Sequence, residues 1–256
     1  MKSVSMTEKN PQRVALVTGG AIRVGRAITM ALAAEGYDLM VSYRSSAGPA
    51  QQTQAAVQAL GRQCETVRAD LSEPSAAGLV IDAVRSKFGR LDLVVNSAAN
   101  FDERALLEVD ADAWDQSMSV NVRAPHLIVR AAADLLKEAR GSVVNIVDLS
   151  AFQPWTDYPA HSVSKASLAH LTRIQARALG PEIRVNGIAP GAVLQPDDWP
   201  PARWHALAGT APLQRVGTPD DVARAVIFFA GAGFVTGQIL AVDGGRILGA
   251  PKGNGD

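Results

Sequence analysis

The sequence lacks most of the features that would tie it to an oxidising compartment, a membrane or a nucleic acid. Its 256 residues include one cysteine, Cys64, so no intrachain disulfide can form, and a reducing cytoplasmic compartment fits. The 25 basic and 25 acidic residues cancel, which leaves no electrostatic footprint for nucleic acid or an anionic membrane. No apolar run reaches the roughly 18 residues of a membrane span. There is also no Cys/His cluster with the spacing of metal ligands. We therefore expect a cytoplasmic protein without a metal, whose partner is a small molecule.

The two ends of the chain are polar. Residues 1–12 lack the apolar middle of a secretory signal, and we expect a flexible lead-in there. The last residues, 249–256, have a similar composition, although a tail in this place can also reach a neighbouring subunit. Residues 13–256 are then expected to form one domain, which is an ordinary size for a single α/β core.

Short apolar runs alternate with longer helical patterns along the chain. Continuous β-branched runs indicate strands buried on both faces, as in a parallel sheet. They occur at residues 14–17, 39–41, 64–68, 91–95, 143–147, 183–188 and 239–242, with 64–68 the weakest. Helical patterns lie near residues 24–35, 49–61, 74–88, 111–138, 158–179 and 218–231. This alternation predicts a single doubly wound Rossmann-type α/β domain, with a mainly parallel seven-stranded sheet flanked by helices.

The first predicted strand leads into a glycine-rich turn and a helix. In "VALVTGGAIRVGRAI", Gly19 permits a tight turn, Gly25 allows close packing of the helix, and free backbone N–H groups at the helix start suit a pyrophosphate. The second strand ends in "SYRSS", residues 42–46, and carries no carboxylate that would bind the ribose 2′-hydroxyl of NAD. Ser42, Tyr43, Arg44 and Ser45 suit the 2′-phosphate of NADPH instead, whereas Asp38 lies at the wrong end of that strand.

The turn resembles the T-G-x-x-x-G-x-G turn of the short-chain dehydrogenase/reductases, with Thr18, Gly19 and Gly25 in place and Arg23 at the middle glycine. An Arg there can pair with a phosphate, and Val24 follows it in the cofactor turn. Other stretches resemble the same family from residue 13 to about 246. The resemblance implies cofactor contacts at Asp70, Leu71, Asn96, Ala98, Ala99, Pro190 and Gly191, a ribose-binding Lys165, and a catalytic Asn121 that anchors a proton-relay water.

Within that family the chain resembles the pteridine reductases most. The shared features are Arg23, the "YRSS" strand end, Phe101 after "NSAAN", and Asp148 where most relatives have Ser. The resemblance implies that Phe101 stacks on a flat pterin and that Asp148 binds its ring N–H groups. It also implies that a loop with Leu194, Trp199 and Trp204 lies against the substrate, and that the protein is a homotetramer packed through its long helices.

His161 departs from the family pattern, because relatives have a proton-donating Tyr four residues before the Lys. One interpretation is substitution: imidazole titrates near neutrality, and Asp148 and His161 act as a coupled proton donor with Lys165 nearby. The second is relocation, in which Tyr158, on a neighbouring helical face, reaches the substrate. The third is loss, in which the chain binds NADPH and a ligand without turnover.

We expect an NADPH-dependent reductase of a pteridine such as dihydrobiopterin or dihydromonapterin, with dihydrofolate as a further candidate. The expected catalytic groups are Asp148, His161, Lys165 and Asn121. The expected substrate contacts are Phe101, Asp148, Tyr158, Leu194, Trp199 and Trp204. The alternatives are a carbonyl reductase of another flat substrate and a non-catalytic NADPH-binding protein.

Overall fold

The computed structural model describes residues 12–196 and 199–249. Nearly all of the predicted lead-in, residues 1–11, and the tail, residues 250–256, lie outside this range. The described chain forms one seven-stranded sheet in the order β3-β2-β1-β4-β5-β6-β7, with every neighbouring pair parallel. The strands are β1 (Val14–Thr18), β2 (Asp38–Tyr43), β3 (Cys64–Arg68), β4 (Leu93–Asn96), β5 (Ser142–Ile146), β6 (Arg184–Pro190) and β7 (Ile239–Val242). The predicted doubly wound fold is therefore confirmed.

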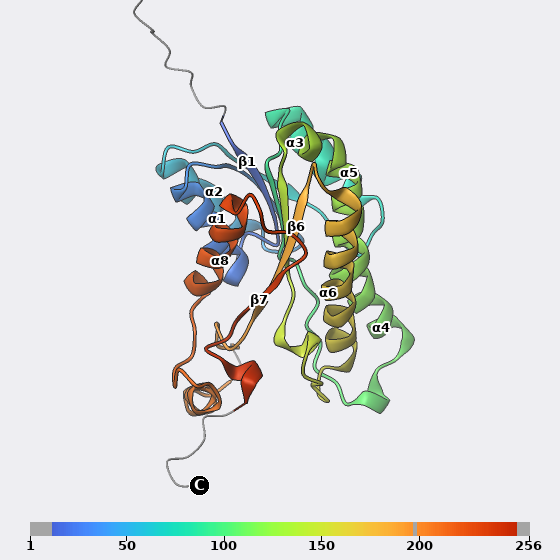
Figure 1. Cartoon of the computed structure of the whole chain (residues 1–256), viewed down its shortest axis with the longest axis vertical. Coiled ribbons are helices and arrows are strands. Elements are labelled where there is room, and N and C mark those ends of the chain that lie inside the picture. The colour runs from blue at the N-terminus through green and yellow to red at the C-terminus, as the bar shows by residue number, and fades with distance from the viewer. Residues whose placement is uncertain (1–11, 197–198, 250–256) are drawn as a thin grey trace, which may run out of the picture.

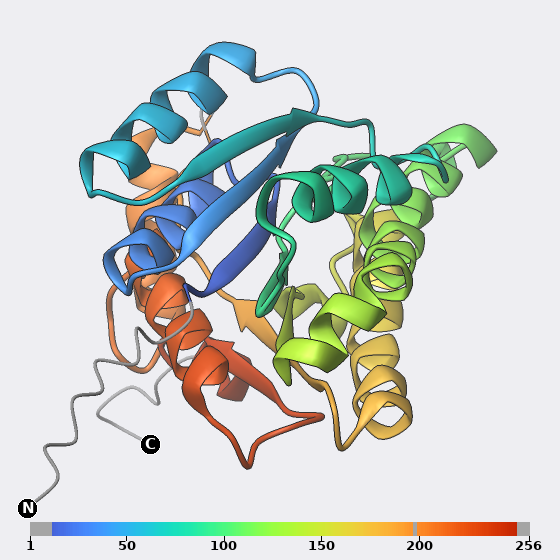
Figure 2. The ribbon, with the colours of Figure 1, turned by 90° about the horizontal axis from the view of Figure 1, so that it is seen from above.

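Helices cover both faces of this sheet, as Figure 1 and the view from above in Figure 2 show. One face carries α1 (Arg23–Ala34), α2 (Ala47–Ala59) and α8 (Pro219–Gly231). The other carries α3 (Ala76–Phe88), α4 (Ala111–Met118), α5 (Ala124–Ala139) and α6 (Pro159–Leu179). Alternate residues of β1 serve the two layers: Ala15 and Val17 pack toward α1 and α8, and Val14 and Leu16 pack toward α3 and α5. Such two-sided burial explains why the strands read as continuous apolar runs.

The prediction of one continuous helix over residues 111–138 is wrong, because the helix is interrupted. The helix α4 ends at Met118, and a π-helical turn, Ser119–Arg123, separates it from α5. A π turn widens the helix by one residue and is often found at functional sites. Here it contains Asn121, whose buried side chain bonds to groups outside the helix.

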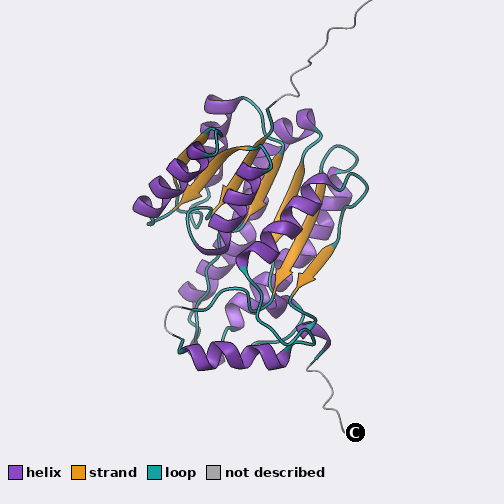
Figure 3. Ribbon diagram, turned by 90° about the vertical axis from the view of Figure 1, so that its left-hand side faces the viewer, coloured by secondary structure: helices purple, strands orange, loops and turns teal. Residues whose placement is uncertain are grey.

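Beyond the carboxyl ends of the strands lies a smaller group of loops and short helices, which Figure 3 shows below the sheet. It includes α7 (Pro201–Ala206) and the 3-10 turn Arg246–Leu248. The sequence predicted a loop that carries Leu194, Trp199 and Trp204, but Trp204 lies in the helix α7. Its Pro201 occupies the first turn of α7, where a missing N–H costs nothing.

The strand register aligns the carboxyl ends of the central strands. Thr18 of β1 lies opposite Ser42 of β2 and Asn96 of β4. The chain leaves β1 toward β2 on one side and reaches β4 on the other, so the strand order reverses between β1 and β4. Ligands bind at this reversal point in open α/β sheets.

Candidate active site

A cavity of about 1050 Å³ opens at this edge of the sheet. Its volume is enough for a dinucleotide and a small planar substrate together. The cavity brings together most of the residues that the sequence singled out. On the cofactor side these are Gly19, Arg23, Val24, Gly25, Ser42, Tyr43, Arg44, Ser45, Asp70, Leu71, Ala98, Ala99, Lys165, Pro190 and Gly191. On the substrate side they are Phe101, Asp148, Tyr158, His161, Leu194, Trp199 and Trp204.

The turn after β1 has the geometry that a pyrophosphate needs. Gly19 has a φ of 63°, and a Cβ on Gly25 would lie 2.2 Å from the Gly19 carbonyl oxygen. Only glycine at position 25 therefore lets α1 pack this closely on the turn. The first turn of α1 has no side-chain cap, which leaves its backbone N–H groups to an anion. Arg23 lines the cavity with a φ of 54°, a left-handed conformation that is uncommon outside glycine.

The end of β2 presents hydroxyls and a cation to the cavity. Arg44 is exposed, and its backbone carbonyl accepts a hydrogen bond from Nε of Arg68 at 3.2 Å. Asp38 lies buried at the opposite end of β2, where Oδ1 accepts from the Gln63 N–H at 2.8 Å. On the neighbouring loop, hydrogen bonds from the Ser72 backbone and hydroxyl lower the pKa of Asp70. The strand end thus lacks a carboxylate where an NAD ribose would need one, as the sequence predicted.

Two predicted residues do not line the cavity. The first, Asn96, bonds across the sheet to the neighbouring strand, where its Nδ2 donates to Oδ1 of Asn145 at 2.8 Å. Asn145 in turn donates to Thr172 at 2.9 Å, which links β4 and β5 to α6. Thr18 instead holds the loop that follows β4, because its hydroxyl accepts from the backbone N–H groups of Ser97 and Ala98 at 3.0 and 3.1 Å.

Asn121 is the second predicted residue outside the cavity wall. Its Oδ1 accepts from the Asn100 N–H at 2.7 Å, and its Nδ2 donates to the Asn100 carbonyl at 3.0 Å. The same Nδ2 donates to Oγ of Ser164 at 2.8 Å. Both donors of the amide are therefore used by protein atoms. The side chain holds the backbone of Asn100 against the start of α6.

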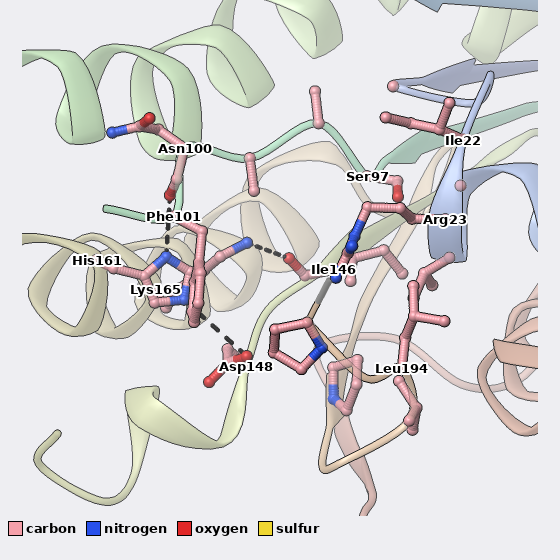
Figure 4. A pocket seen from close by; sticks show the side chains of 18 of the residues that line it. Ile22, Arg23, Ser97, Asn100, Phe101, Ile146, Asp148, His161, Lys165 and Leu194 are labelled. Carbon is pink, nitrogen blue, oxygen red and sulfur yellow. Dashed lines mark hydrogen bonds and ion pairs between the residues drawn. The ribbon is translucent and has the colours of Figure 1, made fainter. Parts of the chain in front are cut away.

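His161 lies buried at the centre of the substrate side, 2% exposed (Figure 4). Its Nδ1 lies 3.0 Å from the Asn100 carbonyl oxygen, and its Nε2 lies 4.0 Å from Oδ2 of Asp148. The other carboxylate oxygen, Oδ1 of Asp148, accepts from the Ser150 N–H at 2.7 Å. Asp148 therefore keeps one oxygen turned toward His161 and the cavity.

Lys165 follows one helical turn later, and its ammonium group is buried at the end of β5. Its Nζ donates to the Ile146 carbonyl at 2.7 Å. Burial lowers the pKa of Lys165 to about 8, and the nearby Asp148 opposes that shift. One of the three protons of Nζ is used by Ile146, so the group can also donate to a ligand in the cavity.

Aromatic side chains form the outer wall of the substrate side. The ring of Phe101 stacks on Tyr158 with centroids 4.4 Å apart, and meets His161 edge-on at 4.7 Å. The phenol of Tyr158 donates to Oε2 of Glu103 at 2.6 Å. Across the cavity Arg203 lies over the ring of Trp199, with Cζ 3.6 Å from the centroid. Trp204 is almost fully buried there.

The sequence did not single out several residues of the cavity wall. They include Ser97, Asn100, Trp155, Arg203 and Arg246. Asn100 acts through its backbone carbonyl, which leaves no mark in a sequence. Arg246 follows the strand end "VDGG", residues 242–245, and only the fold brings it beside the cavity. Across residues 12–196 and 199–249, no three His, Cys, Asp or Glu side chains gather closely enough to hold a metal ion. Nor does any described helix combine the length and apolarity needed to cross a membrane.

A parallel doubly wound sheet, an open helix N-terminus at its reversal point and a large adjoining cavity define a dinucleotide-binding α/β protein. A family model described as "Enoyl-(Acyl carrier protein) reductase" matches residues 20–246. Pteridine reductase 1 of Leishmania tarentolae is 34% identical over 286 residues, covering 95% of this chain and 99% of that protein. This chain belongs to the short-chain dehydrogenase/reductase family. It is accordingly a nicotinamide-dependent oxidoreductase.

Other similar proteins show how far the likeness extends. The crystal structure of FolM alternative dihydrofolate reductase 1 from Brucella canis, complexed with NADP, has a TM-score of 0.86. It is 32% identical and covers 94% of this chain and 96% of that one. An L-rhamnose 1-dehydrogenase of Sphingomonas is 31% identical over 92% of this chain and 96% of that protein. Identity at this level does not select a substrate.

Proposed function

We propose that this protein is an NADPH-dependent reductase of a pteridine, acting on a C=N bond of a dihydropterin or of dihydrofolate. The observation that carries the proposal is that a carboxylate, Asp148, and an aromatic ring, Phe101, both lie next to His161. A pterin is flat and presents several N–H groups at one edge. An aromatic face and a carboxylate acceptor in one cavity suit such a ring.

The residues present fit a bound NADPH. The uncapped start of α1 suits the pyrophosphate, and the glycine turn leaves no room for a side chain at position 25. Arg44, Ser42 and Ser45 suit the 2′-phosphate, because they offer a cation and two hydroxyls at the end of β2. Lys165 would bind the nicotinamide ribose with the N–H bonds that Ile146 leaves open. When bound, NADPH supplies the hydride.

On the substrate side, Phe101 offers a face for stacking, and Trp204 with Leu194 encloses the opposite wall. Asp148 would accept from the ring and exocyclic N–H groups. His161 would give a proton to the ring nitrogen of the reduced bond. That nitrogen is more basic than a carbonyl oxygen, so an imidazole can take the place of the phenol that relatives use.

Two further parts of the proposal rest on the family resemblance. The tetramer would pack through the exposed faces of α4, α5 and α6. A carbonyl reductase of another flat substrate is the second candidate, because the aromatic wall of the cavity would suit any planar ring.

A substrate panel tests the proposal. NADPH oxidation would be followed with dihydrobiopterin, dihydromonapterin, dihydrofolate and planar ketones, and NADP+ reduction would be followed with L-rhamnose-type sugars. We expect turnover of at least one pterin with kcat/KM well above that of every ketone. A preference for ketones would support the second candidate. Tight NADPH binding without turnover of any of them would indicate a non-catalytic binding protein.

A further inference from the structure

The bond between His161 and the Asn100 carbonyl determines which ring nitrogen carries a proton. A carbonyl oxygen can only accept a hydrogen bond, and Nδ1 of His161 lies 3.0 Å from it. An unprotonated Nδ1 would place two lone pairs against each other. The ring is 2% exposed, so water does not replace the bond. Nδ1 therefore carries the proton in the neutral imidazole.

A ring of hydrogen bonds fixes that carbonyl. Asn121 bonds both backbone groups of Asn100, at 2.7 Å for the N–H and 3.0 Å for the carbonyl. Asn121 also donates to Ser164, and Ser164 donates to the backbone carbonyl of His161 at 2.7 Å. The π-helical turn, the loop after β4 and the start of α6 are thus connected around the imidazole. A shift of the Asn100 carbonyl would release Nδ1.

The second nitrogen, Nε2, has no hydrogen-bond partner within the described part of the chain. It is buried, and it faces Oδ2 of Asp148 at 4.0 Å (Figure 4). A neutral His161 can only accept at this atom, because its one proton is on Nδ1. A protonated His161 can donate there.

We infer that the Asn100 carbonyl, held by Asn121, positions His161 as the Nδ1–H tautomer, so that Nε2 delivers the proton and only the imidazolium can deliver it. This inference rests on the proposed function. It makes Asn100 and Asn121 positioning residues, whereas His161 is the group that touches substrate.

The proton balance follows from this geometry. The Nε2–H bond breaks, and its proton goes to the substrate nitrogen while the adjacent carbon gains the hydride and its electron pair. His161 is left neutral with Nδ1 still bonded to Asn100, and a proton from solvent restores the imidazolium. The charged groups that face the imidazole are Asp148, whose Oδ2 lies 4.0 Å from Nε2, and Lys165, one helical turn further along α6. Tyr158 packs on Phe101 and its phenol donates a hydrogen bond to Glu103, so this carboxylate is engaged away from the imidazole.

The tautomer can be measured without cofactor or substrate. Long-range ¹H–¹⁵N spectra of the full chain with labelled histidine would resolve four imidazoles, and a His161→Gln variant would assign one. We expect neutral His161 to be protonated at Nδ1 and not at Nε2. A dominant Nε2–H tautomer would overturn the inference, whatever substrates the enzyme turns over.

Variants then connect the tautomer to proton delivery. Asn121→Asp keeps the acceptor for the Asn100 N–H but loses the donor to its carbonyl. We expect a mixed tautomer, kcat lower by about 10- to 100-fold, an altered pH profile of kcat, and a KM for NADPH within about twofold. Ser117→Ala is the matched control, because it removes a 3.1 Å bond to the Asn100 side chain and leaves the carbonyl held. Its tautomer should be unchanged.

The NMR spectra test the tautomer of His161, and the kinetic measurements test proton delivery to a pterin. An Nδ1–H imidazole in a chain that reduces no pterin would contradict the proposed function and the proton delivery, but would leave the tautomer established. Pterin reduction whose rate does not fall as the pH rises would contradict delivery by the imidazolium. If Asn121→Asp does not fold, the spectrum of the natural chain still decides the tautomer.

Discussion

Asp148 and His161 face each other across the substrate side of the cavity, with 4.0 Å between Oδ2 and Nε2. That distance is too long for a direct hydrogen bond, so the carboxylate and the imidazole face each other without one. Asp148 comes from the end of β5 and His161 from the first turns of α6, so the sheet edge and the helix are both needed to bring the pair together. We propose that this pair takes the role that the family resemblance assigns to a Tyr phenol.

Tyr158 is expected to have a minor part in proton delivery. Its phenol is engaged by Glu103 at 2.6 Å, and its ring packs on Phe101. Tyr158→Phe removes the hydroxyl and keeps the stacking ring, so we expect kcat for a pterin to fall by less than about threefold. A loss comparable to that of a general acid, roughly 10²- to 10⁴-fold, would favour the relocation interpretation.

The glycine turn offers a matched pair of substitutions. Gly25→Ala would place a Cβ 2.2 Å from the Gly19 carbonyl oxygen, so the turn must shift, and we expect NADPH affinity to fall by about 10-fold or more. Gly78→Ala, on the exposed side of α3, meets nothing within 4 Å. It should instead stabilise the fold by about 0.5–1 kcal/mol. Cofactor titration and denaturant unfolding of both variants would check this, and equal behaviour of the two would contradict it.

Arg44 is expected to select the phosphorylated cofactor. A charge-assisted hydrogen bond contributes about 1.5–3 kcal/mol, so Arg44→Ala should weaken NADPH by about 10- to 100-fold. NADH lacks the 2′-phosphate, and its Kd should change little. Arg85→Ala is the control, because Arg85 pairs with Asp134 on the outside of α3, away from the cavity. Equal losses for NADPH and NADH would show that Arg44 does not contact the phosphate.

Lys165 gives a pH-dependent prediction for the stability of the apoprotein. Its folded pKa of about 8 lies below the roughly 10.4 of a free lysine, so burial of the ammonium costs on the order of 3 kcal/mol below pH 8. Between about pH 8 and 10.4 the unfolded chain binds more protons, so this cost fades as the pH rises.

Lys165→Met removes the cost together with the bond to Ile146. The stability of the variant relative to the natural chain should therefore be most favourable near pH 7 and decline toward about pH 10. Denaturant unfolding at both pH values measures the difference, with the exposed Lys137→Met as the control for loss of a lysine. A difference that does not vary with pH would contradict the assigned burial.

The sequence predicted the sheet well, because strands such as Val14–Thr18 are buried on both faces and read as unbroken apolar runs. It also predicted correctly that Asp38 lies at the start of β2, far from the strand end where a cofactor ribose would bind. This prediction follows from strand direction alone. It did not predict the π turn at Ser119–Arg123, since a one-residue widening leaves the helical pattern intact.

The site was harder to predict where backbone atoms or distant partners act. The Asn100 carbonyl has no sequence signature, although it fixes the orientation of His161. Glu103 lies 55 residues from Tyr158 in the chain and meets it only through the fold. Asn96 was expected to contact the cofactor because it ends β4, next to Ser97. Its side chain instead bonds to Asn145 on the neighbouring strand, a partner that the local sequence does not indicate.

We propose that this chain reduces a pterin with a proton from His161. The most direct measurement is NADPH oxidation with dihydrobiopterin over a pH series, for the natural chain beside His161→Gln and His161→Tyr. We expect the natural chain to turn over the pterin, with a rate that falls as the pH rises, because only a protonated His161 can donate from Nε2. The Gln variant should lose about 10²- to 10⁴-fold, and the Tyr variant should show a different pH dependence. An inactive natural chain with activity in the Tyr variant alone would contradict the account.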